Sequence, residues 1–273
     1  MRSSGPIRRG VAAALTVVGV CTATLVAAAP AQADDPPIVY SALGDSLSAG
    51  AGALLALPYD LNLLCTRNTG SYPVLWVNNH DVSSFDFAAC SGATTVDVIN
   101  NQLGGLSSAT TLVTVTAGAN DFASVQAIFT CHTQSDAACE NAWEDLSDAY
   151  TADLGDLLDA MLAAITTAAP NAEVVLMGPP GLFALSSGCG LLGLSLAKRT
   201  AIADAGAVFR GISSARASAN GAVYGDAVPA FNGHRICNTS PWIHDLSGLV
   251  FAYHPDDDGY RYGYLPTLEA ITG

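Results

Sequence analysis

The sequence predicts an α/β fold, a three-layer α/β/α sandwich in which helices cover both faces of a central, mainly parallel five-stranded sheet. Short apolar runs typical of buried strands alternate along the chain with longer segments of helical character, as in βαβ units. Several of these runs stop at glycine, which commonly marks the end of a buried strand. No repeat, low-complexity tract or linker interrupts residues 38–273, which favours a single domain.

The first element in chain order is a leader over residues 1–33. Arg2, Arg8 and Arg9 form a basic start, residues 11–29 are small and apolar, and residues 31–33 (Ala-Gln-Ala) offer a cleavage site. This three-part pattern predicts a secretory signal peptide, with residues 34–273 as one domain outside the cell. The competing interpretation is a membrane anchor. It is disfavoured because the stretch is only mildly hydrophobic and a cleavage site follows it.

Five strands and three helices are expected in the rest of the chain. The clearest strand is at residues 111–117, which are mostly β-branched and stop at Gly118. In such a sheet ligands bind at the carboxyl ends of the strands, so the residues that follow each strand are candidates for a site. The other strands are expected at residues 38–43, 84–89, 172–177 and 221–225, and the helices at residues 95–103, 143–167 and 195–218.

The composition excludes several classes of protein. The chain carries 24 Asp and Glu against 10 Lys and Arg, and only 12% of its residues are charged. Removing residues 1–33 leaves 7 basic and 24 acidic residues, a net charge of −17. A chain this acidic lacks the basic surface that nucleic acids require. With 50% hydrophobic residues, it is also not disordered.

Six of the seven cysteines lie beyond the leader, and an even number in a secreted chain predicts three disulfides. Six cysteines allow fifteen pairings, and spacing alone does not choose among them. Zinc binding is the competing interpretation. It is disfavoured because no two cysteines are separated by two residues and the histidines lack ligand spacing. We therefore expect no metal site.

Four residues stand where a site is expected. Ser46 follows the first strand, Gly92 the second and Asn120 the third, and His254 lies in a late loop before a predicted helix start marked by proline and acids. Each has an ordinary structural explanation as well: serine and asparagine cap helices, glycine allows turns, and a single histidine is more often structural than catalytic. Their order along one α/β sheet is the more specific signal.

That order resembles the SGNH/GDSL hydrolase superfamily, over about residues 38–270. The matching blocks are residues 44–47 (Gly-Asp-Ser-Leu), Gly92, residues 118–121 (Gly-Ala-Asn-Asp) and His254. The chain is more similar still to the secreted actinobacterial esterases, lipases and phospholipases. The resemblance implies the three-layer SGNH fold and nearest-neighbour disulfides, which are Cys65–Cys90, Cys131–Cys139 and Cys189–Cys237.

One departure affects the catalytic histidine. Many family members have an aspartate three positions before it, where this chain has Phe251. The branch resembled includes members that use a backbone carbonyl, so we expect the carbonyl of Phe251 or Ala252 to orient His254. A carbonyl fixes the tautomer and the ring. Asp245 and Asp256 are less favoured alternatives.

The expected reaction is acyl transfer to Ser46 followed by hydrolysis, with His254 as general base. The N–H groups of Ser46 and Gly92 and the side-chain amide of Asn120 would form the oxyanion hole. No metal or organic cofactor is needed. Activity is expected to fall as the pH drops through about 6 to 7, where an ordinary histidine protonates.

The favoured substrates are fatty-acyl esters, those of a lipase or esterase or of a phospholipase acting on the 1-acyl position. Two apolar segments, residues 53–58 and 181–194, suit an acyl chain or lipid surface unless they pack on the core. We expect a monomer without stable membrane insertion. The alternatives are a carbohydrate acetyl esterase on the same fold and, from another class, a non-catalytic secreted binding module.

Overall fold

The computed structural model describes residues 1–2, 5, 10, 37–186, 188–190 and 193–273. Residues 37–273 form one compact unit, and residues 1–36 are a separate one. The expected leader lies outside the described residues apart from four isolated positions. A search of the described residues finds no helix that is both long and apolar enough to cross a membrane.

The expected sheet is confirmed, and all five of its strands are parallel, in the order β2-β1-β3-β4-β5. The most buried strand is β3, the one with the highest β-branched content. The chain passes from β1 out to β2 and then returns to the other side of β1 at β3. The carboxyl ends of these three strands therefore border the crevice where such sheets bind ligands. The strands are β1 (Ile38–Gly44), β2 (Val82–Phe87), β3 (Leu112–Thr116), β4 (Glu173–Met177) and β5 (Val223–Gly225).

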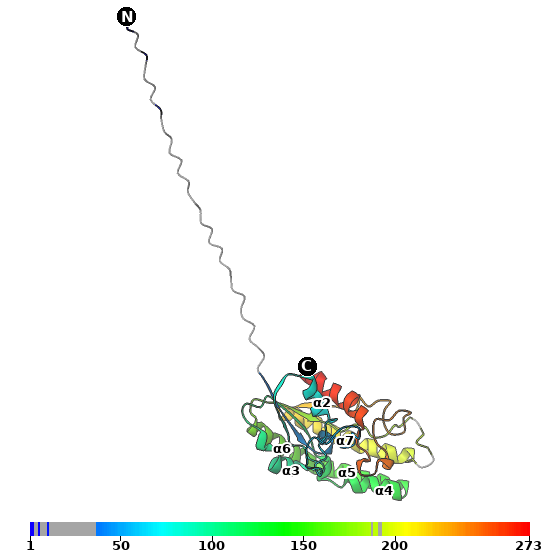
Figure 1. Ribbon diagram of the computed structural model, residues 1–273. Helices are drawn as coiled ribbons and strands as arrows, with labels where there is room; N and C mark the ends of the chain where they lie inside the picture. Colours follow the sequence, from blue (N-terminus) through cyan, green and yellow to red (C-terminus); the bar gives the residue numbers. More distant parts are fainter. Residues whose placement is uncertain (3–4, 6–9, 11–36, 187, 191–192) are drawn as a thin grey trace. The chain divides into compact units, whose positions relative to one another are not determined.

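Helices cover both faces of the sheet, as Figure 1 shows. On one face α2 (Tyr72–Asn79) packs against α8 (Leu265–Thr272), and on the other α6 (Gly155–Ala168) packs against both α3 (Thr95–Asn101) and α7 (Leu196–Ala219). The core includes the fully buried Tyr40, Trp76 and Leu158. The remaining helical segments of the described chain are α1 (Ser46–Ala49), η1 (Leu103–Gly105), η2 (Ala119–Asp121), α4 (Ser124–Thr133), α5 (Asp136–Ala149), η3 (Tyr150–Leu154), η4 (Leu246–Phe251) and η5 (Gly259–Tyr264).

The prediction of a single helix at residues 143–167 is wrong in two respects: the helix begins earlier, and it is interrupted. Helix α5 begins at Asp136, because Ser135 caps it by accepting a hydrogen bond from the N–H of Ala138. A π-helical turn, η3, then separates α5 from α6. The hydroxyl of the buried Tyr150 in η3 is hydrogen-bonded to that of Ser124 at 3.0 Å. Because Ser124 directly follows the loop after β3, this bond places η3 beside that loop.

Three disulfides join the cysteine pairs implied by the family resemblance. The bridge between Cys65 and Cys90 links the loop after α1 to the loop after β2, across 25 positions of sequence. The bridge between Cys131 and Cys139 joins α4 to α5 across only 8 positions. The third joins Cys189 to Cys237, so each bridge fixes a loop or helix pair on the unit that carries the sheet.

We predict that removing the Cys65–Cys90 bridge destabilises the protein more than removing Cys131–Cys139. The reason is that the longer closed loop restricts the unfolded chain more. On the chain-entropy relation the costs are about 3.5 and about 2.5 kcal/mol. Urea unfolding of the Cys65→Ser/Cys90→Ser and Cys131→Ser/Cys139→Ser variants measures both. A larger loss in the second variant would contradict this order.

Candidate active site

Ser46 stands at a sharp turn where β1 meets α1. Gly44, the last residue of β1, has φ +113°, and a side chain there would place its Cβ 2.2 Å from the carbonyl oxygen of Thr116 in β3. Only glycine permits this approach of the two strand ends. Asp45 then caps α1, its carboxylate accepting a hydrogen bond from the N–H of Leu47 at 2.9 Å. Ser46 is thus the first residue of a helix, with a free backbone N–H.

His254 lies against Ser46. Its Nε2 is 2.8 Å from the hydroxyl oxygen of Ser46, and its Nδ1 is 3.0 Å from the carbonyl oxygen of Ala252. A carbonyl can only accept, so Nδ1 carries the proton and Nε2 is free to accept the serine proton. Of the two expected carbonyls, that of Ala252 reaches the ring. The carbonyl of Phe251 accepts instead from the backbone N–H of His254, at 3.1 Å.

Burial lowers the pKa of His254 below its ordinary value of 6.5, because the imidazolium loses solvation. The hydrogen bond to the carbonyl of Ala252 and the nearby carbonyl of Phe251 oppose this lowering of the pKa, and the nearby His244 adds to it. The ring is therefore neutral at pH 7. Neutral imidazole is the form that can remove a proton from serine.

The two aspartates considered as alternative partners of His254 are engaged elsewhere. Asp245 accepts hydrogen bonds from the N–H and the hydroxyl of Ser247, at 2.9 and 2.5 Å. Asp256 accepts from the N–H of Gly259 at 2.9 Å, which stabilises the start of the helical segment after His254. Their carboxylates thus serve local turns, and the contact to Nδ1 comes from the backbone.

Gly92 and Asn120 lie on neighbouring loops. Gly92 has φ +81°, a left-handed conformation, and its surroundings would leave room for a side chain. The backbone angle rather than crowding therefore favours glycine here. The amide nitrogen of Asn120 donates one hydrogen to the carbonyl of Ala93 at 3.1 Å. This bond joins the two loops and leaves the second amide hydrogen of Asn120 available.

The two loops are also tied to the nucleophile turn and to each other. The N–H of Cys90 donates to the carbonyl of Gly44 at 2.9 Å. Asp121 accepts from the N–H and the hydroxyl of Thr95, at 3.0 and 2.6 Å. Ser46, Gly92 and Asn120 are therefore held by three connected segments, each after a different strand, as the sequence pattern indicated.

Sequence reasoning missed the support behind His254. Tyr253 has φ +67°, a strained conformation for a tyrosine, and its N–H donates to the carbonyl of His244 at 2.8 Å. The ring of His244 in turn bonds the carbonyl of Gly52 at 2.8 Å. His132 is half-buried and hydrogen-bonded to the hydroxyl of Tyr253. Only the proximity of residues 244 and 254 in sequence hinted at this arrangement.

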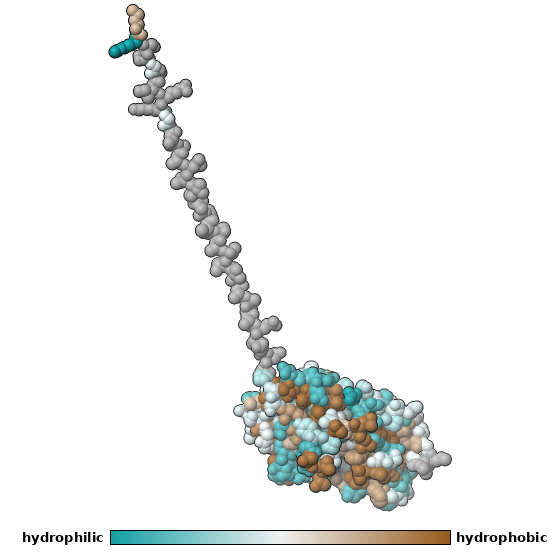
Figure 2. Space-filling model, in the orientation of Figure 1, coloured by the Kyte–Doolittle hydropathy of each residue, from teal (hydrophilic) through white to brown (hydrophobic). Residues whose placement is uncertain are grey.

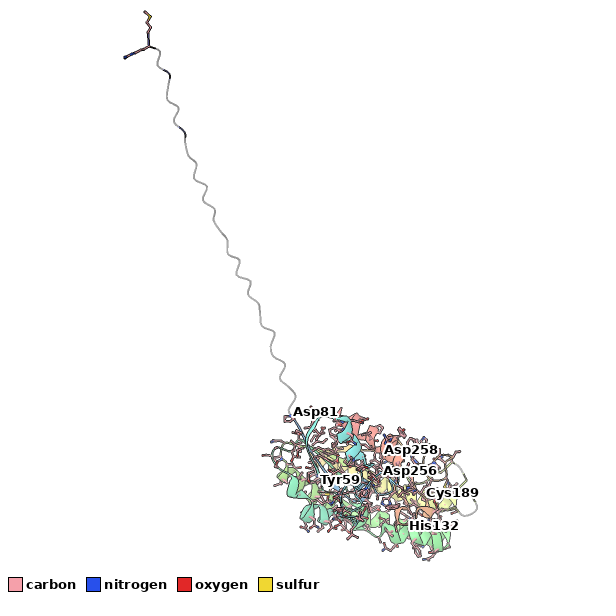
Figure 3. All side chains as sticks on the ribbon, in the orientation of Figure 1. Tyr59, Asp81, His132, Cys189, Asp256 and Asp258 are labelled. Atoms are coloured by element: carbon pink, nitrogen blue, oxygen red, sulfur yellow. A yellow bond between two sulfur atoms is a disulfide. The ribbon has the colours of Figure 1, made fainter. Side chains whose placement is uncertain are left out.

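Two of the cavities are lined by residues close in sequence to His254 and Asn120. One of about 880 Å³ is lined by His244, Tyr253 and Asp256, among others, and Figure 3 shows that Asp256 lies at the same end of the molecule as His132 and Cys189, which also line it. The second, of about 410 Å³, is lined mostly by apolar residues, among them Ala119, which precedes Asn120 in sequence. Phe183 contributes to both. Among the described residues, no three His, Cys, Asp or Glu side chains are grouped to hold a metal ion.

The expected apolar segments divide between core and surface. Leu182 and Phe183 line the smaller cavity, whereas residues 191–192 lie outside the described part of the chain. In the first segment Leu54, Leu55 and Leu57 are exposed to solvent. The sequence could not separate these cases because both segments are rich in leucine.

A parallel sheet with a serine–histidine pair and amide donors at its carboxyl edge is the arrangement of an ester hydrolase. The chain belongs to the GDSL-like lipase/acylhydrolase family, whose model matches residues 42–262. It is 41% identical to lipase 1 of Streptomyces coelicolor over 250 residues, which are 90% of this chain and 92% of that protein. Both findings identify a carboxylic ester hydrolase of the GDSL type.

Solved structures of high similarity agree. The extracellular lipase of Streptomyces rimosus superimposes with a TM-score of 0.81 at 38% identity, over 85% of this chain and 99% of that one. Phospholipase A1 of Streptomyces albidoflavus NA297 gives a TM-score of 0.81 at 39% identity, over 86% and 99% of the two chains. The SGNH-type sandwich is thus the fold of this chain.

We predict that the acid limb of kcat/KM lies below pH 6.5, because burial holds the pKa of His254 below that value. Catalysis needs the neutral ring, so activity persists to a lower pH than an exposed histidine would allow. Hydrolysis of a soluble p-nitrophenyl ester across pH 4 to 9 measures it. A midpoint at or above pH 7 would contradict the effect of burial.

Proposed function

We propose that this protein is a secreted enzyme that hydrolyses fatty-acyl esters through a Ser46–His254 dyad supported by the carbonyl of Ala252. The observation that carries the proposal is the unbroken chain of contacts from Ser46 to His254 at 2.8 Å and from His254 to Ala252 at 3.0 Å. Such a chain activates a serine hydroxyl, which is otherwise a weak nucleophile.

In the first half of the reaction, Nε2 of His254 accepts the hydroxyl proton as Ser46 attacks the ester carbonyl. The negative charge on the tetrahedral oxygen is bound by the N–H groups of Ser46 and Gly92 and the free amide hydrogen of Asn120. His254 then gives its proton to the leaving alcohol. In the second half, His254 activates water, which releases the acid from Ser46 by the same route.

The substrate class follows from the smaller cavity and from the relatives. The cavity of about 410 Å³ is lined by Ala119, which precedes Asn120 in sequence, and by Phe183, Phe209 and Ile202, which suit a hydrocarbon chain. The relatives named lipase and phospholipase A1 at 38–41% identity favour fatty-acyl over acetyl esters. We therefore place triglycerides and the 1-acyl position of phospholipids among its substrates.

Residues 1–33 act in this proposal as a secretory signal peptide, so that the hydrolase domain begins at Asp34. The basic start, the apolar stretch and the cleavage motif support it. Three disulfides support an oxidising compartment. The mature enzyme acts as a monomer without stable membrane insertion.

Replacing the nucleophile tests the dyad. Ser46→Ala should lower kcat at least about 10⁴-fold and leave the fold intact, because the attacking oxygen is gone while the oxyanion donors remain. It should also abolish labelling by a fluorophosphonate probe. The control is Ser108→Ala, which removes an exposed hydroxyl. Full activity of purified Ser46→Ala protein would refute the dyad.

Filling the smaller cavity tests the acyl-chain site. Gly206 of α7 lines it, and no atom lies within 4 Å of a Cβ built there, so Gly206→Phe should fold. We expect palmitate and laurate esters to lose about tenfold or more in kcat/KM, since several methylene groups lose their burial, while acetate esters are unaffected. Gly211→Phe is the matched control, because Gly211 lies on the same helix in open space and does not line the cavity. An equal loss of kcat/KM for the long-chain and the acetate esters would argue against this site. So would the same loss for the long-chain esters in the Gly211→Phe control.

A further inference from the structure

The loop after the nucleophile helix presents an unusual number of hydrophobic side chains to solvent. Single exposed leucines are common in soluble proteins, but clusters of them mark an interaction surface. Leu55, Leu61 and Leu64 are 90, 99 and 88% exposed. We call residues 54–64 the apolar loop. Its other exposed large hydrophobic residues are Leu54, Leu57, Tyr59 and Leu63.

The apolar loop is fixed in place by its backbone and its few polar residues. The N–H of Tyr59 donates to the carbonyl of Arg67 at 2.9 Å, and the N–H of Leu55 donates to the carboxylate of Asp257 at 3.1 Å. The side chain of Arg67 pairs with Asp60 at 2.6 Å. The leucines are therefore held outward by an ordered loop.

Both ends of the apolar loop adjoin the candidate active site. Just before it, Gly52 is so close to His254 that a Cβ on Gly52 would lie 3.1 Å from the Cβ of the histidine. Just after it, Cys65 is bridged to Cys90 and accepts a hydrogen bond from the N–H of Ser91, the residue before Gly92. The loop that carries the exposed leucines is therefore anchored at both ends next to the candidate catalytic residues.

A second exposed hydrophobic segment directly precedes His254. Leu246, Leu249 and Val250 of η4 are 53, 81 and 83% exposed. Leu249 has φ +53°, a conformation that leucine rarely adopts. Figure 2 shows that hydrophobic residues gather in contiguous patches on the visible face of the molecule. The chain therefore exposes apolar side chains on the segments before and after its reacting residues.

The charges near these segments indicate what kind of surface they fit. Neither residues 54–64 nor residues 246–253 contain a lysine or arginine, and the carboxylate of Asp60 is neutralised by Arg67. Binding to anionic lipid relies on basic residues near the membrane. With a net charge of −17 over residues 34–273, the protein is repelled by such a surface. A neutral or zwitterionic lipid surface carries no such penalty.

We propose that the apolar loop, with Leu246, Leu249 and Val250, is the surface by which this enzyme adsorbs to a zwitterionic lipid–water interface. Insertion of these side chains into the interface would bring Ser46 to ester groups that are poorly soluble in water. The inference rests on the proposed function, because it concerns how that same site meets its substrate.

Binding is measured with protein that carries Ser46→Ala, so that vesicles stay intact and catalysis plays no part. We expect it to sediment with phosphatidylcholine vesicles, and less so when phosphatidylglycerol replaces part of the phosphatidylcholine. Adding Leu61→Ser and Leu64→Ser should weaken binding about tenfold or more, because two nearly fully exposed leucines lose their burial in the lipid.

The matched control adds Val125→Ser and Leu196→Ser, which remove two exposed hydrophobic residues from helices outside both segments. It should bind like the parent. With Ser46 restored, Leu61→Ser/Leu64→Ser should hydrolyse dissolved p-nitrophenyl acetate normally and lose activity only on vesicles.

Equal vesicle binding by the loop variant and its parent would overturn the proposal. So would a dimer in solution that the loop substitutions convert to monomers, since the surface would then join two copies of the chain. Vesicle binding by a protein that shows no ester hydrolysis with Ser46 intact would refute the proposed function and leave the docking surface standing.

Discussion

The close contact between the ends of β1 and β3 is the constraint on which the site depends. A glycine without Cβ lets the two strand ends meet, and Asp45 then fastens them: its carboxylate accepts from the hydroxyl of Thr116 at 2.6 Å. Its N–H donates to the carbonyl of Thr116 at 2.9 Å. The same hydroxyl of Thr116 accepts from the N–H of Ser48 at 3.1 Å, so the first turn of α1 is bound to both strands. Ser46 lies between Asp45 and Ser48, which these hydrogen bonds hold. The orientation of the Ser46 side chain is therefore set by the fixed backbone around it.

The loops after β2 and β3, which carry Gly92 and Asn120, are held by hydrogen-bonded links back to that turn. The loop after β2 is bonded to Gly44 through Cys90, and the loop after β3 is bonded to that loop through Asn120. His254 comes from the opposite end of the sequence and is oriented by its own loop. The carbonyl of Ala252 orients the ring of His254 as a carboxylate would. It carries no full negative charge, however, so it stabilises the imidazolium less than a carboxylate would.

The sheet, and the position of the candidate residues after its strands, could be predicted from sequence because both follow general rules. Continuous β-branched runs such as residues 111–117 predict buried parallel strands. Because sites in these folds lie at the carboxyl ends of the strands, the residues that follow each run are the candidates for a site. Helix α2 was missed because Tyr72, Pro73 and Trp76 on it are buried around the helix, leaving no amphipathic period. The π-turn at Tyr150 and the left-handed Tyr253 accompany contacts with Ser124 and His244, and no strand or helix pattern in the sequence pairs these residues.

Burial of the Asp45 carboxylate, next to Ser46, makes the stability of the folded protein depend on pH. Burial raises the pKa of Asp45 to about 6, from 3.8 in the unfolded chain. The folded protein therefore holds this proton more tightly than the unfolded one. The resulting stabilisation, on the order of 3 kcal/mol, is complete below pH 4 and lost as the pH rises through 6. In the proposed mechanism His254 has the opposite requirement, since a general base must be deprotonated. The fold thus gives up part of its own stability under the conditions in which its chemistry can proceed.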